Sequence, residues 1–323
     1  MMGWDMGSGK ANAKAKANAK AKAAGARVGG RAKGVALVAA GVGLVAVNAA
    51  LAWKLVRLDA HMRRTDAGLA RIYTVRDEAG NRMRVLNVGG AYQSATYLGD
   101  RWHEPPLAYF RALDHMFEAE GVSCAEGAES EPFSIRDVLM IGGGGCAWPK
   151  HALMTRSNLR VDVVEPDPAV VEIARRFFFV DKLERTLRKR EGAAGAARFS
   201  VIVDDGLGYL AGCEKRYDAI VNDAFTGKVA VGDLAGAAGI RAVKDHLNVN
   251  GLYLVNVVSG PQWREFRHLI RLINALDEQF AHVTVVFASD GAFGGKDNYL
   301  VIATDGDYAF SDVIPFDEGD ANA

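Results

Sequence analysis

The segment from Asp137 to Lys150 constrains the fold of this chain more than any other part of the sequence. It reads DVLMIGGGGCAWPK, a short apolar run followed by four glycines and then by residues suited to a helix. Glycines between a strand and a helix let the backbone turn sharply and approach a ligand without obstruction by Cβ atoms. The N-terminus of the helix would add free N–H groups and the positive end of a dipole. Alone this is a weak signal, because glycine runs also occur in ordinary loops.

Short apolar strands alternate with amphipathic helices after this turn. Continuous apolar strands of this kind are typical of a parallel sheet that is covered by helices on both faces. The last two strands are close enough to form a hairpin, which would make one of them antiparallel. The pattern predicts an α/β, Rossmann-like domain over residues 135–306. The expected strands are 138–141, 161–165, 199–205, 217–223, 251–258, 282–288 and 298–304.

Acidic residues stand at the ends of successive predicted strands. Glu165 ends the second strand, at the spacing from the glycine turn where an acid can accept hydrogen bonds from both ribose hydroxyls. Asp204 and Asp205 end the third strand, and Asp223 ends the fourth. Ligands bind at the carboxyl ends of the strands in open α/β sheets, so we expect these acids to meet in one crevice. Asp167 precedes a proline and is interpreted as a helix cap.

The region before this domain has a different character. From Arg71, RIYTVRDEAGNRMRVLNVGG reads as two strands around an Ala-Gly-Asn turn, and AYQSATYL reads as a third. Residues 105–120 carry apolar side chains at helical spacing, and a polar loop follows them. We therefore expect residues 71–134 to form a small β-rich lid with a connecting helix.

The N-terminus combines a basic tail with an apolar run. Residues 1–33 contain eight Lys or Arg and a single acid, in a near-repeating pattern with Ala, Asn and Gly. We interpret this tail as a solvated or membrane-surface segment, with a nucleic-acid-binding arm as the less favoured alternative. The uncharged run from Val35 to Trp53 is just long enough to cross a membrane, at ~1.5 Å of rise per residue. We expect one uncleaved transmembrane helix at residues 34–56.

Charge and cysteine content exclude several classes of function. The chain has 39 basic and 39 acidic residues, so everything after the basic tail is acidic overall. This balance does not suit a general nucleic-acid binder, but it does suit a cationic substrate. The three cysteines have no CxxC spacing, which argues against a disulfide framework and a structural zinc site. We expect no bound metal and no nucleic-acid partner.

From Arg71 to about Thr304 the chain resembles the spermidine synthase family, the polyamine aminopropyltransferases, and especially its spermidine synthase-like relatives. The matching segments, in order, are YQSATYL, VLMIGGGGCAWPK, VDVVEPDPAVVEIARRFF, VIVDDGLGYL and YDAIVNDAF. The resemblance implies a class I methyltransferase-type sheet with an N-terminal β lid. It also implies a nucleoside co-substrate, S-adenosylmethionine or its decarboxylated form, and a homo-oligomer of unspecified size.

The resemblance also implies roles for individual residues. Glu165 would hold the ribose, Asp205 would lie near the adenine, and Asp223 would be the catalytic acid beside the reacting amine. Tyr92 and Tyr109 would contact the substrate, although ordinary packing explains these two tyrosines equally well. The full set of expected co-substrate-binding residues is Gly142, Gly143, Gly144, Gly145, Glu165, Asp204, Asp205 and Gln93.

Two acids that polyamine-making members usually have are missing from this chain. The glycine turn continues as Gly145-Cys146 without an Asp, and Asp223 is followed by Ala-Phe-Thr-Gly without a second Asp. A buried ammonium needs a carboxylate partner, so recognition of a diamine loses support. Three functions stay open: aminopropyl transfer to an amine, which we favour; methyl transfer to a small molecule; and a non-catalytic nucleoside-binding scaffold.

The expected location contains a conflict. A single-pass protein of the cell membrane should keep its catalytic domain in the cytoplasm, where its co-substrate is found. However, the tail carries more positive charge than the segment after the apolar run, which predicts a cytoplasmic N-terminus instead. The expected partners are a small-molecule amine and the membrane. Residues 307–323 read as an acidic C-terminal tail.

Overall fold

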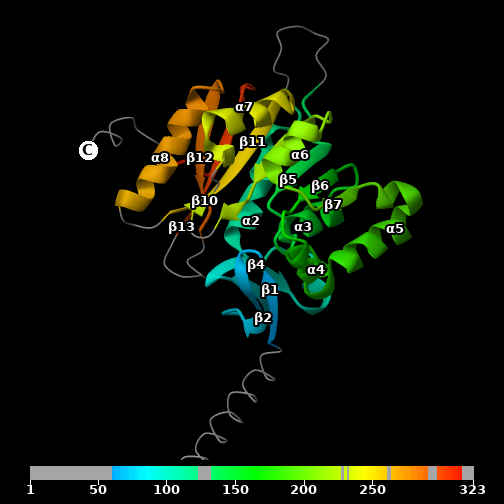
Figure 1. Ribbon diagram of the computed structural model, residues 1–323. Helices are drawn as coiled ribbons and strands as arrows, with labels where there is room; N and C mark the ends of the chain where they lie inside the picture. Colours follow the sequence, from blue (N-terminus) through cyan, green and yellow to red (C-terminus); the bar gives the residue numbers. More distant parts are fainter. Residues whose placement is uncertain are drawn as a thin grey trace, which may run out of the picture. The chain divides into compact units, whose positions relative to one another are not determined.

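The structure is a computed structural model (Figure 1) that describes residues 60–122, 132–226, 229–230, 233–259, 263–289 and 297–314. The expected basic tail at 1–33 and the expected transmembrane helix at 34–56 lie outside the described residues. Within the described part of the chain, no helix is both long enough and apolar enough to span a membrane.

A seven-stranded sheet forms the centre of the main domain, in the order β12-β13-β11-β8-β5-β6-β7. Strand β13 is antiparallel to both of its neighbours, and the other adjacent strands are parallel. The Rossmann-like prediction is confirmed, and so is the expected antiparallel strand, which lies between β11 and β12. The strands are β5 (Asp137–Ile141), β6 (Arg160–Val164), β7 (Phe199–Ile202), β8 (Tyr217–Asn222), β11 (Leu247–Ser259), β12 (His282–Phe287) and β13 (Asp297–Thr304).

Helices cover both faces of this sheet because its strands are apolar on both sides. In β5, Val138 and Met140 belong to a core with α3 and α5, whereas Leu139 and Ile141 belong to a second core with α6, α7 and α8. The alternation of side chains along one strand therefore supplies both cores. The helices are α3 (Ala147–Thr155), α4 (Pro168–Phe177), α5 (Val180–Ala196), α6 (Gly206–Gly212), α7 (Ala237–Asp245) and α8 (Trp263–Asp277).

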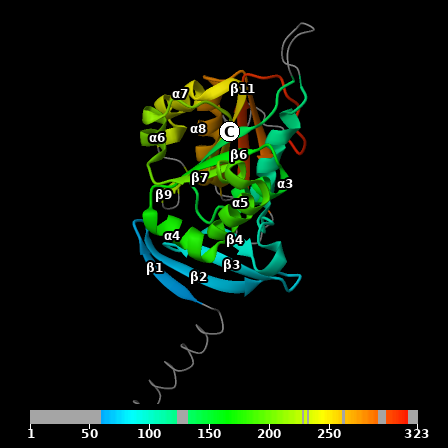
Figure 2. The same cartoon turned by 90° about the vertical axis from the view of Figure 1, so that its right-hand side faces the viewer.

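The lid is a four-stranded antiparallel sheet in the order β1-β2-β3-β4. Its strands are β1 (His61–Thr65), β2 (Gly68–Arg76), β3 (Arg82–Val88) and β4 (Ala91–Tyr97). Figure 2 shows α4 lying against these strands, and Ile72 and Leu86 pack there on Phe177. The lid thus starts ten residues earlier than Arg71, because the basic sequence of β1 hides its strand character.

The connection between the two sheets is shorter and less regular than a single helix over 105–120. It consists of α2 (Ala108–Ala112), which continues as the 3-10 helix η2 (Leu113–Ala119). Phe110, Leu113 and Met116 are buried and pack into the core that contains α3. The remaining short elements are η1 (Gly99–Arg101), β9 (Phe225–Thr226), β10 (Val229–Ala230) and η3 (Asp233–Ala235).

The first half of the expected C-terminal tail is packed against the domain. The Tyr308 hydroxyl donates a hydrogen bond to the carbonyl of Asn250 at 3.0 Å. The Ser311 N–H donates to Glu118 at 2.7 Å. Residues 307–314 are therefore part of the folded domain. Residues 315–323 of this tail lie outside the described residues.

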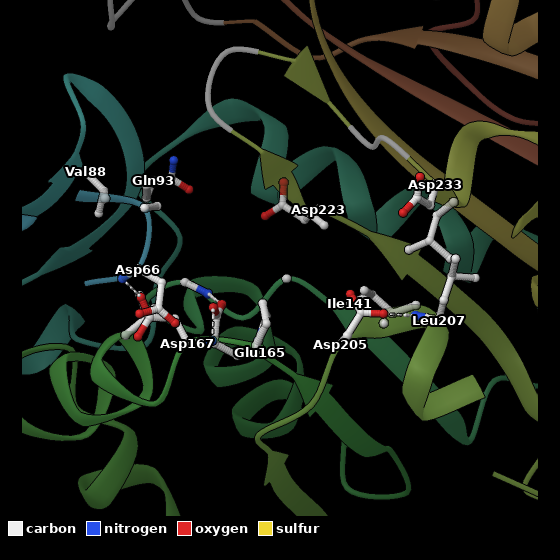
Figure 3. A pocket seen from close by; sticks show the side chains of 18 of the residues that line it. Asp66, Val88, Gln93, Ile141, Glu165, Asp167, Asp205, Leu207, Asp223 and Asp233 are labelled. Atoms are coloured by element: carbon white, nitrogen blue, oxygen red, sulfur yellow. Dashed lines mark hydrogen bonds between the residues drawn. The ribbon is translucent and has the colours of Figure 1, made fainter. Parts of the chain in front are cut away.

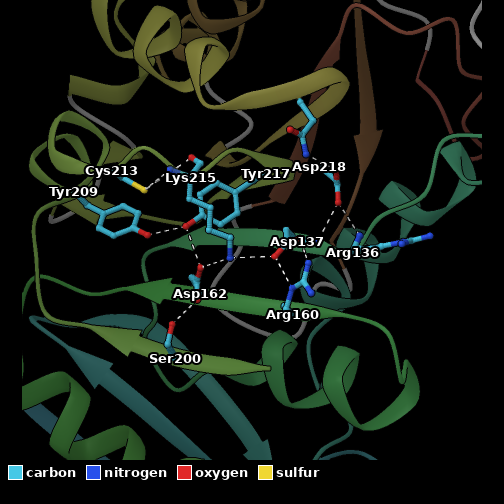
Figure 4. A network of polar contacts seen from close by, with 11 residues as sticks. Arg136, Asp137, Arg160, Asp162, Ser200, Tyr209, Cys213, Lys215, Tyr217 and Asp218 are labelled. Atoms are coloured by element: carbon cyan, nitrogen blue, oxygen red, sulfur yellow. Dashed lines mark hydrogen bonds and ion pairs between the residues drawn. The ribbon is translucent and has the colours of Figure 1, made fainter. Parts of the chain in front are cut away.

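A polar network joins the amino ends of β5, β6 and β8 (Figure 4). Lys215 Nζ lies 3.0 Å from Asp137 and 2.8 Å from Asp162, and the Tyr217 hydroxyl donates to Asp162 at 3.0 Å. Arg160 completes the network by pairing with Asp137. These contacts lie at the amino edge of the sheet. The glycine turn lies at the opposite, carboxyl edge.

Candidate functional site

A cavity of about 630 Å³ opens at the carboxyl edge of the sheet, beneath the lid (Figure 3). The main domain lines it with the residues that follow β5, β6, β7 and β8, and the lid lines it with β3, β4 and the β1–β2 turn. The lining residues are Asp66, Ala67, Leu86, Val88, Gln93, Ile141, Gly142, Gly144, Glu165, Pro166, Asp167, Val170, Asp205, Gly206, Leu207, Asp223, Ala224, Asp233 and Leu234.

Two glycines of the turn line the cavity, and a side chain on either would be strained by positive φ and crowded by nearby backbone. Gly142 has a φ of +94°, and a Cβ there would lie 2.5 Å from the carbonyl oxygen of Asp223. Gly144 has a φ of +47°, and its Cβ would lie 3.3 Å from the carbonyl oxygen of Gln93. Backbone from the sheet and from the lid therefore approaches the turn closely, as expected for a ligand-binding glycine turn.

The other two glycines of the turn are packed into the protein. A Cβ on Gly143 would lie 2.7 Å from the side chain of Val163, and one on Gly145 would lie 2.6 Å from the Ser94 hydroxyl. Neither glycine lines the cavity. Gly145 therefore lets the lid pack closely against the turn.

Glu165 connects the end of β6 to the glycine turn. Its Oε2 accepts hydrogen bonds from the N–H groups of Gly143 at 3.0 Å and Gly144 at 3.1 Å, and its Oε1 accepts one from Asp167 N–H at 3.3 Å. Burial raises the pKa of this carboxyl above its usual value, while these backbone donors lower it. Glu165 lines the cavity where the sequence predicted a ribose-binding acid.

The two acids after β7 have different positions. β7 ends at Ile202, so both acids lie in the following loop and not on the strand end that we expected. Asp205 lines the cavity and caps α6, accepting hydrogen bonds from Leu207 N–H at 3.0 Å and Gly208 N–H at 3.1 Å. Asp204 is exposed and outside the cavity lining, and it accepts a hydrogen bond from the Asp205 N–H at 2.8 Å.

Asp223 lies in the wall of the cavity directly after β8. Burial raises its pKa to about 7; a hydrogen bond from Asn256 opposes this rise, and the charge of Glu165 adds to it. Asn256 Nδ2 donates to Asp223 Oδ1 at 2.7 Å. A carboxyl with this pKa can accept or release a proton near neutral pH, which is the property of a general base or acid.

Of the lid residues that were expected in the site, not all line the cavity. Gln93 lines the cavity, whereas Tyr92 does not and is 45% exposed. The register between β3 and β4 shifts at this point: Tyr92 pairs with Asn87 and Ser94 with Leu86, so Gln93 is an extra residue in β4. Tyr109 is outside the lining but close to Asp223: burial raises its pKa, and the charge of Asp223 raises it further.

Three cavity-lining acids were not expected there from the sequence. Asp66 comes from the β1–β2 turn and Asp233 begins η3. Asp167 is the predicted cap of α4, accepting a hydrogen bond from Ala169 N–H at 2.8 Å, and it lines the cavity as well. The turn sequence TDAG was a signal for a turn at Asp66, but only the fold brings this residue into the lining of the cavity.

The cavity is strongly acidic. Its described lining includes six carboxylates, at Asp66, Glu165, Asp167, Asp205, Asp223 and Asp233, and none of the described lining residues is Lys, Arg or His. Among the described residues, no group of three or more His, Cys, Asp or Glu side chains is placed to hold a metal ion. This arrangement favours a ligand that carries positive charge.

The chain is similar in sequence to known transferases. A polyamine aminopropyltransferase of Aeropyrum pernix is 28% identical over 177 residues, which cover 54% of this chain and 53% of that protein. An eEF1A lysine and N-terminal methyltransferase homolog of Drosophila pseudoobscura pseudoobscura is 26% identical over 164 residues, covering 47% of this chain and 22% of that protein. The chain thus spans about half or less of the length of these curated relatives.

The fold has similar solved structures. A probable spermidine synthase from Corynebacterium glutamicum superposes with a TM-score of 0.58 at 19% identity, covering 77% of this chain and 81% of that one. Residues 122–289, just over half of the chain, match the family described as Spermine/spermidine synthase domain. The chain therefore belongs to the spermine/spermidine synthase domain family.

Proposed function

We propose that this protein is an aminopropyltransferase-like enzyme that uses decarboxylated S-adenosylmethionine and an amine acceptor. The observation that carries the proposal is Asp223, a carboxylate with a pKa of about 7 in the wall of an acidic cavity. The glycine turn, Glu165 and Asp205 supply the surfaces for a nucleoside in the same cavity. Positive charge on both substrates matches the charge of the lining.

The chemistry assigned to Asp223 is proton acceptance. The amine nitrogen attacks the carbon attached to the sulfonium, a C–N bond forms, the C–S bond breaks, and sulfur keeps the electron pair as a neutral thioether. The nitrogen is then cationic and loses one proton, which the carboxylate of Asp223 accepts. Release of a neutral thioether from an acidic cavity is favourable, because the attraction of the acids for the sulfonium charge is gone.

The lining of the cavity favours the decarboxylated co-substrate over the intact one, because it offers few donors for a carboxylate. Intact S-adenosylmethionine carries a carboxylate, and none of the described lining residues is basic. Two N–H groups of the turn, at Gly143 and Gly144, already donate to Glu165. An added carboxylate would meet acids without a cationic partner, which is costly in a partly buried site. The decarboxylated form avoids that cost.

Methyl transfer is the second candidate. It is favoured by the similarity to the methyltransferase homolog and by the absence of the two acids at Gly145 and after Asp223. A small-molecule acceptor without a second ammonium group would not need those acids. A non-catalytic nucleoside-binding scaffold is the third candidate, and any turnover excludes it.

Calorimetric titration of the whole protein with S-adenosylmethionine, its decarboxylated form and methylthioadenosine tests the proposal. We expect the decarboxylated form to bind about tenfold or more tightly than the intact one, because one unpaired charge is avoided. Release of methylthioadenosine in the presence of mono-, di- and triamines then identifies the acceptor. Asp223→Asn should keep nucleoside binding and lose turnover.

The outcomes separate the three candidates. Tighter binding of intact S-adenosylmethionine, with methyl transfer to an acceptor, would replace the proposal by the methyltransferase. Binding without turnover of any acceptor would leave the scaffold. A protein that binds none of the three nucleosides would overturn the nucleoside assignment altogether.

Membrane attachment, cytoplasmic orientation and self-association remain part of the proposal. The support for attachment is the uncharged run within residues 34–56, which follows the basic tail. Fractionation of cells into membrane and soluble parts tests attachment, and protease protection of the catalytic domain in sealed vesicles tests its side. Recovery in the soluble fraction after washing with salt would contradict attachment.

A further inference from the structure

Asp223 is hydrogen-bonded to Asn256, which is in turn hydrogen-bonded to Asn298, and neither asparagine lines the cavity. Asn256 is 2% exposed, and its Nδ2 donates to Asp223 Oδ1 at 2.7 Å. The Oδ1 of Asn256 accepts a hydrogen bond from Asn298 Nδ2 at 2.9 Å. The second bond occupies the carbonyl oxygen of Asn256, so its NH₂ group is the end that faces the carboxylate.

The antiparallel strand makes this arrangement possible. Because β13 runs against β11, its first residues lie at the carboxyl edge of the parallel strands, beside the site. Asn298 pairs with Val258 and Leu300 pairs with Asn256, so the two asparagines are diagonal neighbours on adjacent strands. Both amides therefore sit on rigid sheet backbone, in contrast to loop residues that face the cavity.

We propose that Asn256 and Asn298 are positioning residues that favour the ionised form of Asp223 and present its second oxygen, Oδ2, to the acceptor amine. None of the described residues donates a hydrogen bond to Oδ2. The amide donor stabilises the charged form of the carboxylate without competing for the proton, since an amide does not titrate. This role rests on the proposed function only in its last step, the delivery of the proton to Asp223.

Among the described residues, two titratable groups interact electrostatically with Asp223. Glu165, directly after β6, raises its pKa through like charge. Tyr109 of α2 has its own pKa raised by burial and then by the charge of Asp223. Neither group favours an ionised Asp223, so the hydrogen bond from Asn256 is the contact that offsets burial.

Direct titration of Asp223 tests the proposal without any assay of activity. The protein is labelled with ¹³C at the Asp side-chain carboxyl carbon, and the Asp223 signal is assigned as the one missing from Asp223→Asn. Asn256→Ala should raise the pKa of Asp223 by about one to two units, the usual effect of losing one hydrogen bond to a charged group. Asn298→Ala, which leaves the donor in place but frees its orientation, should raise it by less.

A matched control exists on the same pair of strands. Asn248 lies at the opposite end of β11, and its Nδ2 donates to Asp218 Oδ1 at 2.7 Å, at the edge of the sheet shown in Figure 4. Asn248→Ala removes an exposed hydrogen bond of the same chemical type, between β11 and β8 and far from the cavity. It should leave the titration of Asp223 and the turnover unchanged.

The pH profile then connects the titration with the reaction. If Asp223 accepts the proton, the acidic limb of kcat/KM should move to higher pH in Asn256→Ala by the same amount as the measured pKa, with unchanged binding of methylthioadenosine. An unchanged Asp223 pKa in both asparagine variants would overturn the positioning role. A shifted pKa in a protein without turnover would support the positioning role and contradict the proposed function.

Discussion

The backbone N–H of Asp66 donates a hydrogen bond of 2.6 Å to Oδ2 of Asp167, which connects the first turn of the lid to the first turn of α4. Asp167 is buried, and its Oδ1 accepts from Ala169 N–H at 2.8 Å. One carboxylate therefore starts a helix and closes the lid side of the cavity. Both residues line that cavity.

Removing this carboxylate should loosen the lid. Asp167→Ala loses a helix cap and the partner of the Asp66 N–H, so we expect the free energy of unfolding in urea to fall by about 2 kcal/mol. Nucleoside affinity should fall as well, because a wall of the cavity is no longer fixed. Asp167→Asn keeps one acceptor oxygen and should lose roughly half as much stability.

Asp77 provides the control for this prediction. It accepts a hydrogen bond from Asn81 N–H at 2.7 Å in the β2–β3 turn, and it is outside the cavity lining. Asp77→Ala should leave nucleoside affinity unchanged. Equal loss of affinity in the Asp77 and Asp167 variants would mean that general weakening of the lid, and not this contact, governs binding.

The buried side chain of Lys150 should make the free energy of unfolding rise with pH above neutrality. It is 1% exposed, and its Nζ donates to the carbonyl of Phe178 at 2.7 Å and to the Thr96 hydroxyl at 3.1 Å. Burial lowers its pKa to about 7. Between pH 7 and the ordinary pKa of lysine, the unfolded chain binds a proton that the folded chain does not, so stability from this group rises with pH.

We expect this rise to amount to roughly 1 kcal/mol per pH unit between pH 7 and 8.5. Urea unfolding of Lys150→Met over this range should lack the rise. Lys215→Met is the control: burial lowers the pKa of Lys215, but hydrogen bonds to Asp162 and Asp137 outweigh it and raise the pKa. Both states of that lysine stay charged, so its removal should not change the slope. A slope that persists in Lys150→Met would show another group to be responsible.

A methyl group on the glycine turn should disrupt the site more than the same change in a lid turn. Gly142 and Gly80 both have positive φ, but a Cβ on Gly142 would meet Asp223 at 2.5 Å, whereas one on Gly80 has no neighbour within 4 Å. Gly80→Ala should cost about 1 kcal/mol of unfolding free energy through backbone strain alone. Gly142→Ala should cost at least twice as much and abolish nucleoside binding; equal costs would contradict the close approach.

The acids of the expected nucleoside site should differ in importance. Glu165→Gln keeps an acceptor for the turn but loses the charge, and we expect methylthioadenosine to bind about 10- to 100-fold more weakly by calorimetry. Asp204→Asn should have no measurable effect, because Asp204 is outside the cavity lining. Weaker binding in Asp204→Asn would place that acid in the site after all.

Local sequence was sufficient for the sheet because each strand carries its own signal. The apolar runs of β5 and β8, the glycine turn and the antiparallel pair at the C-terminus are all visible as short-range patterns. The shortfalls are elements whose conformation depends on their surroundings. β1 is rich in arginine and pairs only because β2 offers an edge, and residues 307–314 pack onto a surface that the rest of the domain provides.

In the site, too, residues marked by short-range patterns could be predicted, and residues whose position depends on their surroundings could not. The residues Glu165, Asp205 and Asp223 could be predicted because a parallel sheet brings its carboxyl ends together. Tyr92 lies outside the cavity lining, next to a register shift between β3 and β4 that the motif does not reveal. Asn256 and Asn298 could not be found, since their contact depends on the register between two strands and joins residues that are 42 positions apart in the chain.

The position of β13 between β11 and β12 affects the order in which the sheet can form during synthesis. Among the described strands of this sheet, β12 is bonded only to β13, so it cannot join before β13 has left the ribosome. Until then β11 has an unpaired edge, and Asn256 lacks its hydrogen-bond partner Asn298 on β13. Such late, long-range pairing is slow and exposes strand edges to aggregation. A nascent chain that stops before residue 297 should therefore depend on chaperones.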